Sequence, residues 1–404
     1  MKGTVQDTSQ TDGGVAPVLV LVVTLVAMTA GSVYMNKVSP VLTNMVSDLG
    51  ITTADAGMLI SIFTLSGIFL SIPMGVLTTK YGAYRAGIFS LAALVVGSAV
   101  GAVATTYPLM LASRFIEGIG LMFLATIGPS IVGGAFSNEK RGTAMGILMC
   151  FMAIGQILDL NLAPIMAEAG SWRSFWWLST GLAAVGLVLW VVVIRGVPSA
   201  MDTPPAVSGE RGEAGFALGQ VLRNGGVWLV AAAFFTFMVA HMGAFNFLPT
   251  FLTEVGGVSS TTAGSLTSIA SVIGIPVGVV GGIIADKVGS RKWPLAVALG
   301  LLGVLLLLIP VFPSASYAPM MVLYGCVSME EAGYCKTGAS EVVEPALRST
   351  STAVVNTAQW AGAFLGSTVF GVCLGSVGWN ASFAIMAVVA FVGAVATVLN
   401  RRLR

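Results

Sequence analysis

Long runs of apolar residues, separated by short polar stretches, extend along the chain from residue 17 to residue 400. Each run is close to the ~20 residues that an α-helix needs to cross a bilayer. The pattern predicts twelve transmembrane helices, over residues 17–41, 55–79, 83–106, 108–136, 142–167, 172–195, 226–252, 259–285, 293–313, 317–344, 349–376 and 379–400. The polar segment before the first run lacks a positive n-region and a cleavage site, so we expect that run to be retained as a helix.

The same pattern occurs twice along the chain. Unlike landmarks in the first half recur in the second at a constant displacement of 207 residues. They pair Ala56-Gly57 with Ala263-Gly264, Gly75 with Gly282, Gly82 with Gly289, Arg85 with Lys292, Arg141 with Arg348 and Trp172 with Trp379. A constant displacement indicates two homologous halves, as in membrane transporters built from internal repeats. We therefore expect an all-α membrane protein of two pseudo-symmetric six-helix bundles.

One long polar connection separates the two halves. It contains Pro198, Pro204, Pro205, several Gly and Ser residues and charges of both signs, a composition typical of a flexible linker. The predicted domains are an N-terminal bundle over residues 1–195, a cytoplasmic linker over 196–225 and a C-terminal bundle over 226–404.

Composition identifies lipid as the solvent for most of the surface. Hydrophobic residues make up 56% of the chain and charged residues only 9%, with a mean hydropathy of +0.93, whereas soluble domains have roughly 25% charged residues. The net charge of +2 is too small to indicate nucleic acid as a partner. The lipid bilayer is the expected surroundings of this chain.

The positions of Lys and Arg predict the orientation. Of the 19 such residues, all but four lie in cytoplasmic loops or tails if the N-terminus is cytoplasmic. The exceptions are Arg173 in an outer loop and Lys37, Arg114 and Lys336 at membrane depth. The positive-inside rule then places both termini in the cytoplasm. We expect a multi-pass protein of the bacterial inner membrane.

Two loops between predicted helices have a similar sequence. One runs from Gly75 to Arg85, and the other runs from Gly282 to Lys292. Both resemble the cytoplasmic signature loop of the major facilitator superfamily, in which a glycine and an acid precede a basic residue, a glycine and a basic pair. The second copy is nearly complete, whereas the first has Thr79 where the family usually has aspartate.

Further similarities cover the rest of the chain, at residues 114–120, 139–142 and 171–173. The resemblance implies the fold of that superfamily and a functional monomer, with predicted spans one, four, seven and ten around a central cavity. It also implies a cytoplasmic gate between the bundles; the alternative is that its charges are only solvated loop residues. The gate residues that we predict are Gly75, Gly82, Arg85, Gly282, Asp286, Gly289, Glu341 and Arg348.

Function must come from polar groups at membrane depth, where a charge costs several kcal/mol. The candidates are Lys37, Arg114, Glu117, Asp159, His241, Glu330, Glu331 and Lys336. All except Asp159, which lies on span five, fall on the four spans that the resemblance places around the cavity.

Arg114 and Glu117 are three residues apart, so they lie on one helix face and can touch each other. Either they form a locked ion pair that lets the segment insert, or Glu117 is a proton site from which substrate or helix motion separates Arg114. Asp159 belongs to a polar stripe that reaches the cavity or a neighbouring helix. Lys37, near the outer end of its span, is predicted to snorkel to the lipid headgroups.

On span ten, Glu330, Glu331 and Lys336 cannot all face one cavity, because helical residues are about 100° apart. Either Gly333 permits a bend, or one glutamate faces the cavity while the other groups meet neighbouring helices. We place Glu330 and Tyr334 toward the cavity.

His241 and Tyr34 occupy equivalent positions, 207 residues apart. The histidine either titrates or binds a ligand, or it is an interhelical hydrogen-bond donor. No phosphate loop, dinucleotide fingerprint, zinc motif or serine elbow of an enzyme occurs in the chain. We therefore expect no enzymatic activity, no cofactor and no metal.

Two functions fit these features. The first is proton-coupled symport of a small organic anion or zwitterion by rocker-switch alternating access. The alternative is a proton/drug antiporter that exports lipophilic cations. For the first, the predicted substrate-binding residues are Tyr34, Arg114, His241, Tyr334 and Lys336, and the predicted proton-coupling residues are Glu117, Asp159, Glu330 and Glu331.

Overall fold

The computed structural model describes residues 16–197, 218–288, 290–328, 331–344 and 347–400. Within these ranges the regular elements are helices and no strand occurs. Several helices begin at capping residues. The Thr52 hydroxyl and the Asp55 carboxylate form a capping box at the start of α3, and the Asn224 side chain accepts from Gly226 N at the start of α10.

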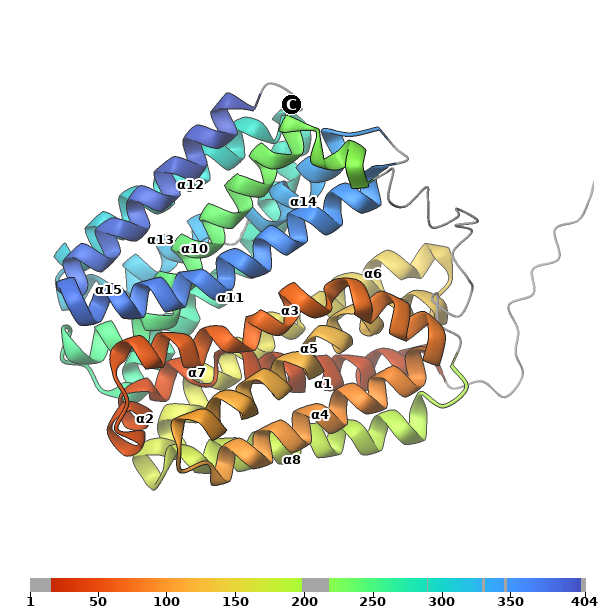
Figure 1. Cartoon of the computed structure of the whole chain (residues 1–404), viewed down its shortest axis with the longest axis horizontal. Coiled ribbons are helices and arrows are strands. Elements are labelled where there is room, and N and C mark those ends of the chain that lie inside the picture. The colour runs from red at the N-terminus through yellow and green to blue at the C-terminus, as the bar shows by residue number, and fades with distance from the viewer. Residues whose placement is uncertain (1–15, 198–217, 289, 329–330, 345–346, 401–404) are drawn as a thin grey trace, which may run out of the picture.

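The helices fall into two consecutive groups. The first group is α1 (Pro17–Asn36), η1 (Ser39–Val41), α2 (Leu42–Leu49), α3 (Thr53–Tyr81), α4 (Ala83–Val103), α5 (Tyr107–Ala135), α6 (Asn138–Met149), α7 (Phe151–Ala169) and α8 (Trp172–Val193). The second group is α10 (Gly225–Glu254), α11 (Ser260–Val288), α12 (Lys292–Leu308), η2 (Ile309–Val311), η3 (Ser314–Ser316), α13 (Tyr317–Ser328), α14 (Glu331–Glu341) and α15 (Arg348–Leu399). In Figure 1 the first group, red to yellow-green, lies beside the second, green to blue.

Ten helical segments among the described residues are long and apolar enough to cross a membrane. Two predicted spans, 349–376 and 379–400, form the single element α15. Gly378 interrupts it with a non-helical backbone, at a φ of 77° that glycine adopts without strain. The predicted span 317–344 is divided between α13 and α14. The membrane-spanning, all-helical architecture is therefore as expected, while the count of twelve spans stays a prediction.

The two bundles meet at α3 with α15, at α7 with α11, and where η1 contacts α10 and α11. The first-bundle helices approach the second bundle on the left of Figure 1 and diverge from it toward the right. The meeting end includes residues 37–52, and the opposite end includes the α3–α4 turn at Gly82. The division of the chain at residues 196–225 stays a prediction.

Close contacts between the bundles occur at positions that the sequence repeat relates to each other. A Cβ atom at Gly57 would lie 2.5 Å from the Ser367 carbonyl oxygen, and one at Gly264 would collide with the Leu160 carbonyl oxygen. These two contacts are equivalent, because both of their members are related by the displacement of 207 residues. The absence of a side chain at both glycines therefore permits helix backbones to touch. We call these contacts, together with Asn161–Ser265, the bundle junction.

Ser39 and Asn246 are also 207 residues apart, and the Ser39 hydroxyl donates to the Asn246 carbonyl oxygen. Two equivalent residues in contact must lie beside the axis that relates the halves. Asn246 also donates to the Ser367 hydroxyl at 2.9 Å. The pseudo-two-fold axis therefore passes close to the Ser39–Asn246 contact at the junction.

Candidate functional site

A cavity of about 540 Å³ lies between the two bundles. Its walls come from α1, α5, α6 and α7 of the first bundle and from α14 and α15 of the second. The lining residues are Met28, Leu121, Met122, Ala125, Thr126, Pro129, Met149, Phe151, Met152, Lys336, Ala353, Asn356, Thr357, Gln359 and Trp360. Because both bundles contribute, a ligand bound there would contact both halves at once.

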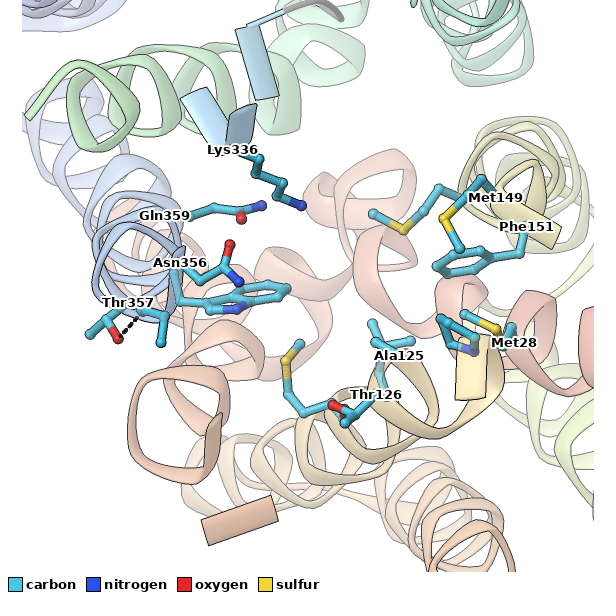
Figure 2. A pocket seen from close by; sticks show the side chains of 15 residues that line it. Met28, Ala125, Thr126, Met149, Phe151, Lys336, Asn356, Thr357 and Gln359 are labelled. Atoms are coloured by element: carbon cyan, nitrogen blue, oxygen red, sulfur yellow. Dashed lines mark hydrogen bonds between the residues drawn. The ribbon is translucent and has the colours of Figure 1, made fainter. Parts of the chain in front are cut away.

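The polar side of this central cavity belongs to the second bundle. Lys336 extends from α14 toward the cavity, and Asn356 and Gln359 extend from α15 (Figure 2). Among the described lining residues, Lys336 alone has a charge. The opposite wall is apolar, with Met28, Met149 and Phe151 facing it in Figure 2. The cavity thus combines one cation and two amides with a flexible, polarizable surface.

Lys336 was predicted from the sequence as a binding residue, whereas the lining residues from α15 were not. Asn356, Gln359 and Trp360 are three and one residues apart, which puts them on one face of a helix. A polar pair beside a tryptophan in an otherwise apolar span was the available signal. The methionines gave no such signal, because methionine is equally common on lipid-facing and packed surfaces.

A cluster of charged side chains is buried inside the first bundle. Glu117 on α5 accepts from Lys37 Nζ through Oε1 and from Arg114 Nη1 through Oε2, both at 2.5 Å. All three side chains are completely buried. The sequence prediction that Arg114 and Glu117 touch is confirmed. We call Lys37, Arg114, Glu117 and the neighbouring Asp159 the charge cluster.

Backbone carbonyl groups and a hydroxyl group accept further hydrogen bonds from the two cations. Arg114 donates to the carbonyl oxygens of Tyr34 at 2.6 Å and Met35 at 3.3 Å. Lys37 donates to the Ser98 hydroxyl at 3.2 Å and lies 4.4 Å from the ring centroid of Trp176. The cluster therefore connects α1, α4, α5 and α8 through hydrogen bonds and cation–π contacts.

The prediction that Lys37 snorkels to the headgroups is wrong. Its helix ends at Asn36, and the side chain of Lys37 lies among Ser98, Glu117 and Trp176, so that Lys37 is 0% exposed. A buried ammonium needs a counter-charge, and Glu117 provides it. The sequence contained both residues but not the fold that brings them together.

Asp159 on α7 is the fourth member of the cluster, and its environment differs from that of Glu117. It is completely buried, and its electrostatic neighbours are Lys37, Arg114 and the backbone N–H of Asn36. Neither of its carboxylate oxygens accepts a hydrogen bond of normal geometry from any described residue. Of the two predicted destinations for this polar stripe, Asp159 thus reaches the neighbouring helices rather than the cavity wall.

The equivalent position in the second bundle holds an uncharged cluster. His241 and Tyr324 stand 207 residues after Tyr34 and Glu117, and the Tyr324 hydroxyl lies 3.1 Å from His241 Nδ1. The imidazole also stacks on Phe237 and Phe245 at centroid distances of 5.3 and 5.4 Å. His241 is 3% exposed, which matches the interhelical hydrogen-bonding alternative. The two halves share a fold but not its polar chemistry.

The predicted substrate-binding residues separate in the structure. Tyr34 and Arg114 belong to the core of the first bundle, and His241 belongs to the core of the second, so that none of them is among the described residues that line the central cavity. Tyr334, predicted to face that cavity, instead lines a second cavity of about 310 Å³ against α11 and α12. Residues two positions apart on a helix point about 200° away from each other, so Lys336 and Tyr334 cannot face the same side.

Several other predicted residues are placed only partly. Glu330 and Gly289 lie outside the described residues. Glu331 begins α14, and Asp286 lies in α11, but their side chains are also outside the described part. Gly75 and Gly282 lie within α3 and α11, respectively.

Several residues of the predicted gate lie at the diverging end of the bundles, while the gate itself stays a prediction. Gly82 turns the chain between α3 and α4 with a φ of 80°, and Arg85 and Arg348 are exposed. Glu341 pairs with Arg291 Nε at 2.7 Å. This ion pair connects the second signature loop to the end of α14, a contact for which the sequence analysis had named Glu341 but not Arg291.

Comparisons with known proteins agree with this architecture. The sequence profile of the Major Facilitator Superfamily matches residues 20–330. The chain belongs to the major facilitator superfamily. It is therefore a multi-pass membrane protein, and the predicted resemblance is confirmed.

Relatives within this superfamily are distant. The nitrite extrusion protein of Bacillus subtilis is 24% identical over 275 residues, which cover 68% of this chain and 67% of that protein. The sialic acid transporter NanX of Escherichia coli is 23% identical over 269 residues, 66% of this chain and 64% of that protein. Among the curated relatives that it matches, the chain spans as little as 24% of the relative's own length.

A solved structure shows the same superfamily fold. A crystal structure of a mutant of the nucleoside transporter NupG superposes with a TM-score of 0.79 at 14% sequence identity. The match covers 96% of this chain and 100% of that one. At this identity the likeness establishes the fold alone.

Proposed function

We propose that the protein is a proton-coupled secondary transporter that moves a small organic anion or zwitterion across the membrane by alternating access. The observation that carries the substrate class is Lys336, the charged residue among the described residues that line the cavity between the bundles. An ammonium group facing a cavity of low polarity attracts an anionic group into it. Lys336 thus takes the role that the sequence analysis had shared between Arg114 and Lys336.

The rest of the cavity favours an organic anion with an apolar body. The side-chain amides of Asn356 and Gln359 lie on the same wall as Lys336 (Figure 2) and can donate to the same anionic group. The methionines and Phe151 opposite them can pack against hydrocarbon. The names of two relatives, a nitrite extrusion protein and a sialic acid transporter, are consistent with an acidic substrate.

The charge cluster supports proton coupling. Buried ionisable groups inside a membrane bundle are expensive and usually functional, and the cluster has two acids, Glu117 and Asp159, beside two cations. It lies in the first bundle, whereas Lys336 lies in the second. Relative motion of the bundles can therefore link the occupation of the cavity to the charge state of the cluster.

The test begins with thermal unfolding of the purified protein in detergent with carboxylates, amino acids, inorganic anions, sugars and cationic drugs. A carboxylate at 100 times its Kd should stabilise the protein by about 2.7 kcal/mol. Lys336→Gln should abolish this shift, whereas Lys140→Gln, which removes an exposed lysine on α6, should leave it unchanged. Anion binding that is equal in both variants would refute the role of Lys336.

Transport in proteoliposomes tests the coupling separately. Uptake of the carboxylate found in this screen should rise several-fold with an imposed pH gradient and should fall to the basal rate when an ionophore removes the gradient. Uptake that ignores the gradient would exclude proton coupling while leaving the anion site intact.

The methionine-rich wall and Trp360 also favour a second candidate, export of lipophilic cations. The same screen separates the two. If only cationic drugs stabilise the protein, and the Lys336→Gln variant shows the same or a larger shift, the substrate is a lipophilic cation and not an anion.

A further inference from the structure

The two acids of the charge cluster are held in opposite ways. Both oxygens of Glu117 form short ion pairs, one to Lys37 and one to Arg114. Asp159 is equally buried, yet its oxygens accept no hydrogen bond of normal geometry from the described residues. Arg114 Nε likewise has no hydrogen-bond partner among the described residues. The cluster therefore contains one carboxylate with both oxygens paired, one carboxyl group with neither oxygen paired, and one donor nitrogen, Arg114 Nε, without a partner among the described residues.

We propose that Asp159 is the group that takes up and releases the coupled proton, that Glu117 stays ionised as the counter-ion of Lys37 and Arg114, and that the charge of Asp159 controls the α7–α11 contact of the bundle junction. This inference rests on the proposed proton coupling and names its residue.

The proton assignment follows from solvation. A buried carboxylate without hydrogen bonds is far more costly than the neutral acid, so an unsatisfied site favours the protonated form. Glu117 is the opposite case, since two cations solvate its negative charge. Protonating Glu117 would break both ion pairs and leave two buried cations with reduced compensation. In the arrangement seen here, the proton belongs on Asp159.

The groups that face Asp159 come from two helices. Lys37 follows α1, and Arg114 comes from α5; both are electrostatic neighbours of Asp159 and both pair with Glu117. On its other side α7 packs against α11, where Ser265 donates to Asn161 Oδ1 at 2.8 Å. The titratable group of α7 at this contact is the exposed Glu168, whose carboxylate accepts from Thr261 N and Thr261 Oγ1.

The position of Asp159 on α7 links it to the junction. Asp159 and Asn161 are two residues apart, so they lie on nearly opposite faces of α7. One face meets the charge cluster. The other meets α11, where the Leu160 carbonyl oxygen touches Gly264 and Asn161 accepts from Ser265. A change in how α7 sits against α1 must therefore change its contact with α11.

Deprotonation supplies such a change. When the Asp159 O–H bond breaks and the proton passes to water, the new carboxylate needs a donor, and Arg114 Nε is a cluster nitrogen that has no partner among the described residues. Pairing these two groups draws α7 toward α5 and away from α11. The protonated cluster thus corresponds to the closed junction seen here, and the ionised cluster corresponds to an opened junction.

The experiment measures the junction directly and needs no substrate. Spin labels are placed at Gly170→Cys, after α7, and Val255→Cys, after α10, in the full chain with its native cysteines replaced by serine. Both sites are exposed and belong to different bundles. Pulsed electron resonance then gives the distance distribution between pH 5.5 and 8.5.

In the otherwise native protein the distances should lengthen as the pH rises. Asp159→Asn and Asp159→Ser, which mimic the neutral acid, should hold the short distance at every pH. Asp159→Glu should restore the response, and Glu117→Gln and the exposed control Glu139→Gln should retain it. A pH response that persists in Asp159→Asn, or that disappears only in Glu117→Gln, would overturn the inference.

The outcomes also separate this inference from the proposed function. Uptake in proteoliposomes that ignores a pH gradient refutes proton coupling itself. If uptake follows the gradient but the distance across the junction does not depend on Asp159, the proton role of Asp159 is refuted and the proposed proton coupling stands. A pH-independent distance in the unsubstituted background refutes the link to the junction.

Discussion

Lys37 shows what a buried charge requires in this protein. Its ammonium is completely removed from solvent and lies between Glu117, the Ser98 hydroxyl and the rings of Tyr34 and Trp176. Each of these partners replaces part of the lost hydration. The partners come from α4, α5 and α8 and from the preceding turn of α1, so the position of Lys37 depends on how these helices pack together.

Removing one member of the Lys37–Glu117 ion pair should lower the free energy of unfolding more than removing both members. Lys37→Met should lower the free energy of unfolding by about 3–5 kcal/mol, because Glu117 keeps a buried charge with one partner fewer. The double variant Lys37→Met/Glu117→Gln should recover part of that loss, because it also removes the buried carboxylate that had lost a partner. Thermal unfolding in detergent measures both, with the exposed Lys140→Met as control. Strictly additive losses would contradict a coupled cluster.

Residue spacing predicted only the local part of this site. Arg114 and Glu117 are three residues apart on one helix, so their contact follows from helix geometry alone. The contact of Lys37 with Glu117 spans 80 residues, and no local rule could supply it. The same limitation applies to Asp159, whose buried face was decided by the packing of α7.

Glycines at helix crossings define how the elements meet. Gly57 and Gly264 were recognised in the sequence as markers of the repeat, without a structural role. In the structure they are equivalent contact points, each pressed against a carbonyl oxygen of the other bundle. A repeat that preserves a glycine at both positions therefore predicts two equivalent helix crossings.

Alanine at these crossings should open the junction. A Cβ atom at either glycine overlaps backbone, and overpacking of this kind costs about 1–3 kcal/mol, which shifts an equilibrium about 5- to 150-fold. Maleimide labelling of Ser39→Cys, buried between the bundles, should therefore accelerate in Gly57→Ala and Gly264→Ala. Gly181→Ala and Gly300→Ala, where a Cβ meets open space, are the matched controls. Equal labelling in all four would show that the crossings do not set the equilibrium.

Helix boundaries were predictable where polar residues interrupt an apolar run. The predicted spans 83–106 and 172–195 match α4 and α8 within a few residues. Span ten was harder, because its side chains are polar on several faces. The assignment of Tyr334 to the cavity was wrong since the rotation of α14 is fixed by its neighbours α10, α12 and α15, which the sequence of the helix does not reveal.

At the scale of the molecule, two equivalent bundles have become chemically different. The first contains the charge cluster, and the second has the His241–Tyr324 pair at the matching position and places Lys336 in the central cavity. Symmetry of the fold provides equivalent contacts at the junction. Asymmetry of the polar groups then gives one bundle the ionisable core and the other the cation that lines the cavity, so that relative motion of the bundles can link the two.

Locking the junction should stop transport without closing the cavity. A Cβ atom at Gly375 would lie 2.8 Å from Thr53 Oγ1, close enough for a disulfide between Thr53→Cys and Gly375→Cys after small adjustments. Oxidation should then reduce carboxylate uptake in proteoliposomes at least tenfold, because alternating access needs the bundles to separate at this end. Reduction should restore it.

Ligand binding distinguishes a locked transporter from a damaged one. The cavity lies on the diverging side of the junction, so the oxidised double variant should still show the thermal stabilisation by carboxylates that depends on Lys336. Each single cysteine variant, treated with the same oxidant, controls for side reactions. Uptake that continues at full rate in fully cross-linked protein would mean that the bundles need not part at α3 and α15, and the rocking motion proposed for this chain would have to be abandoned.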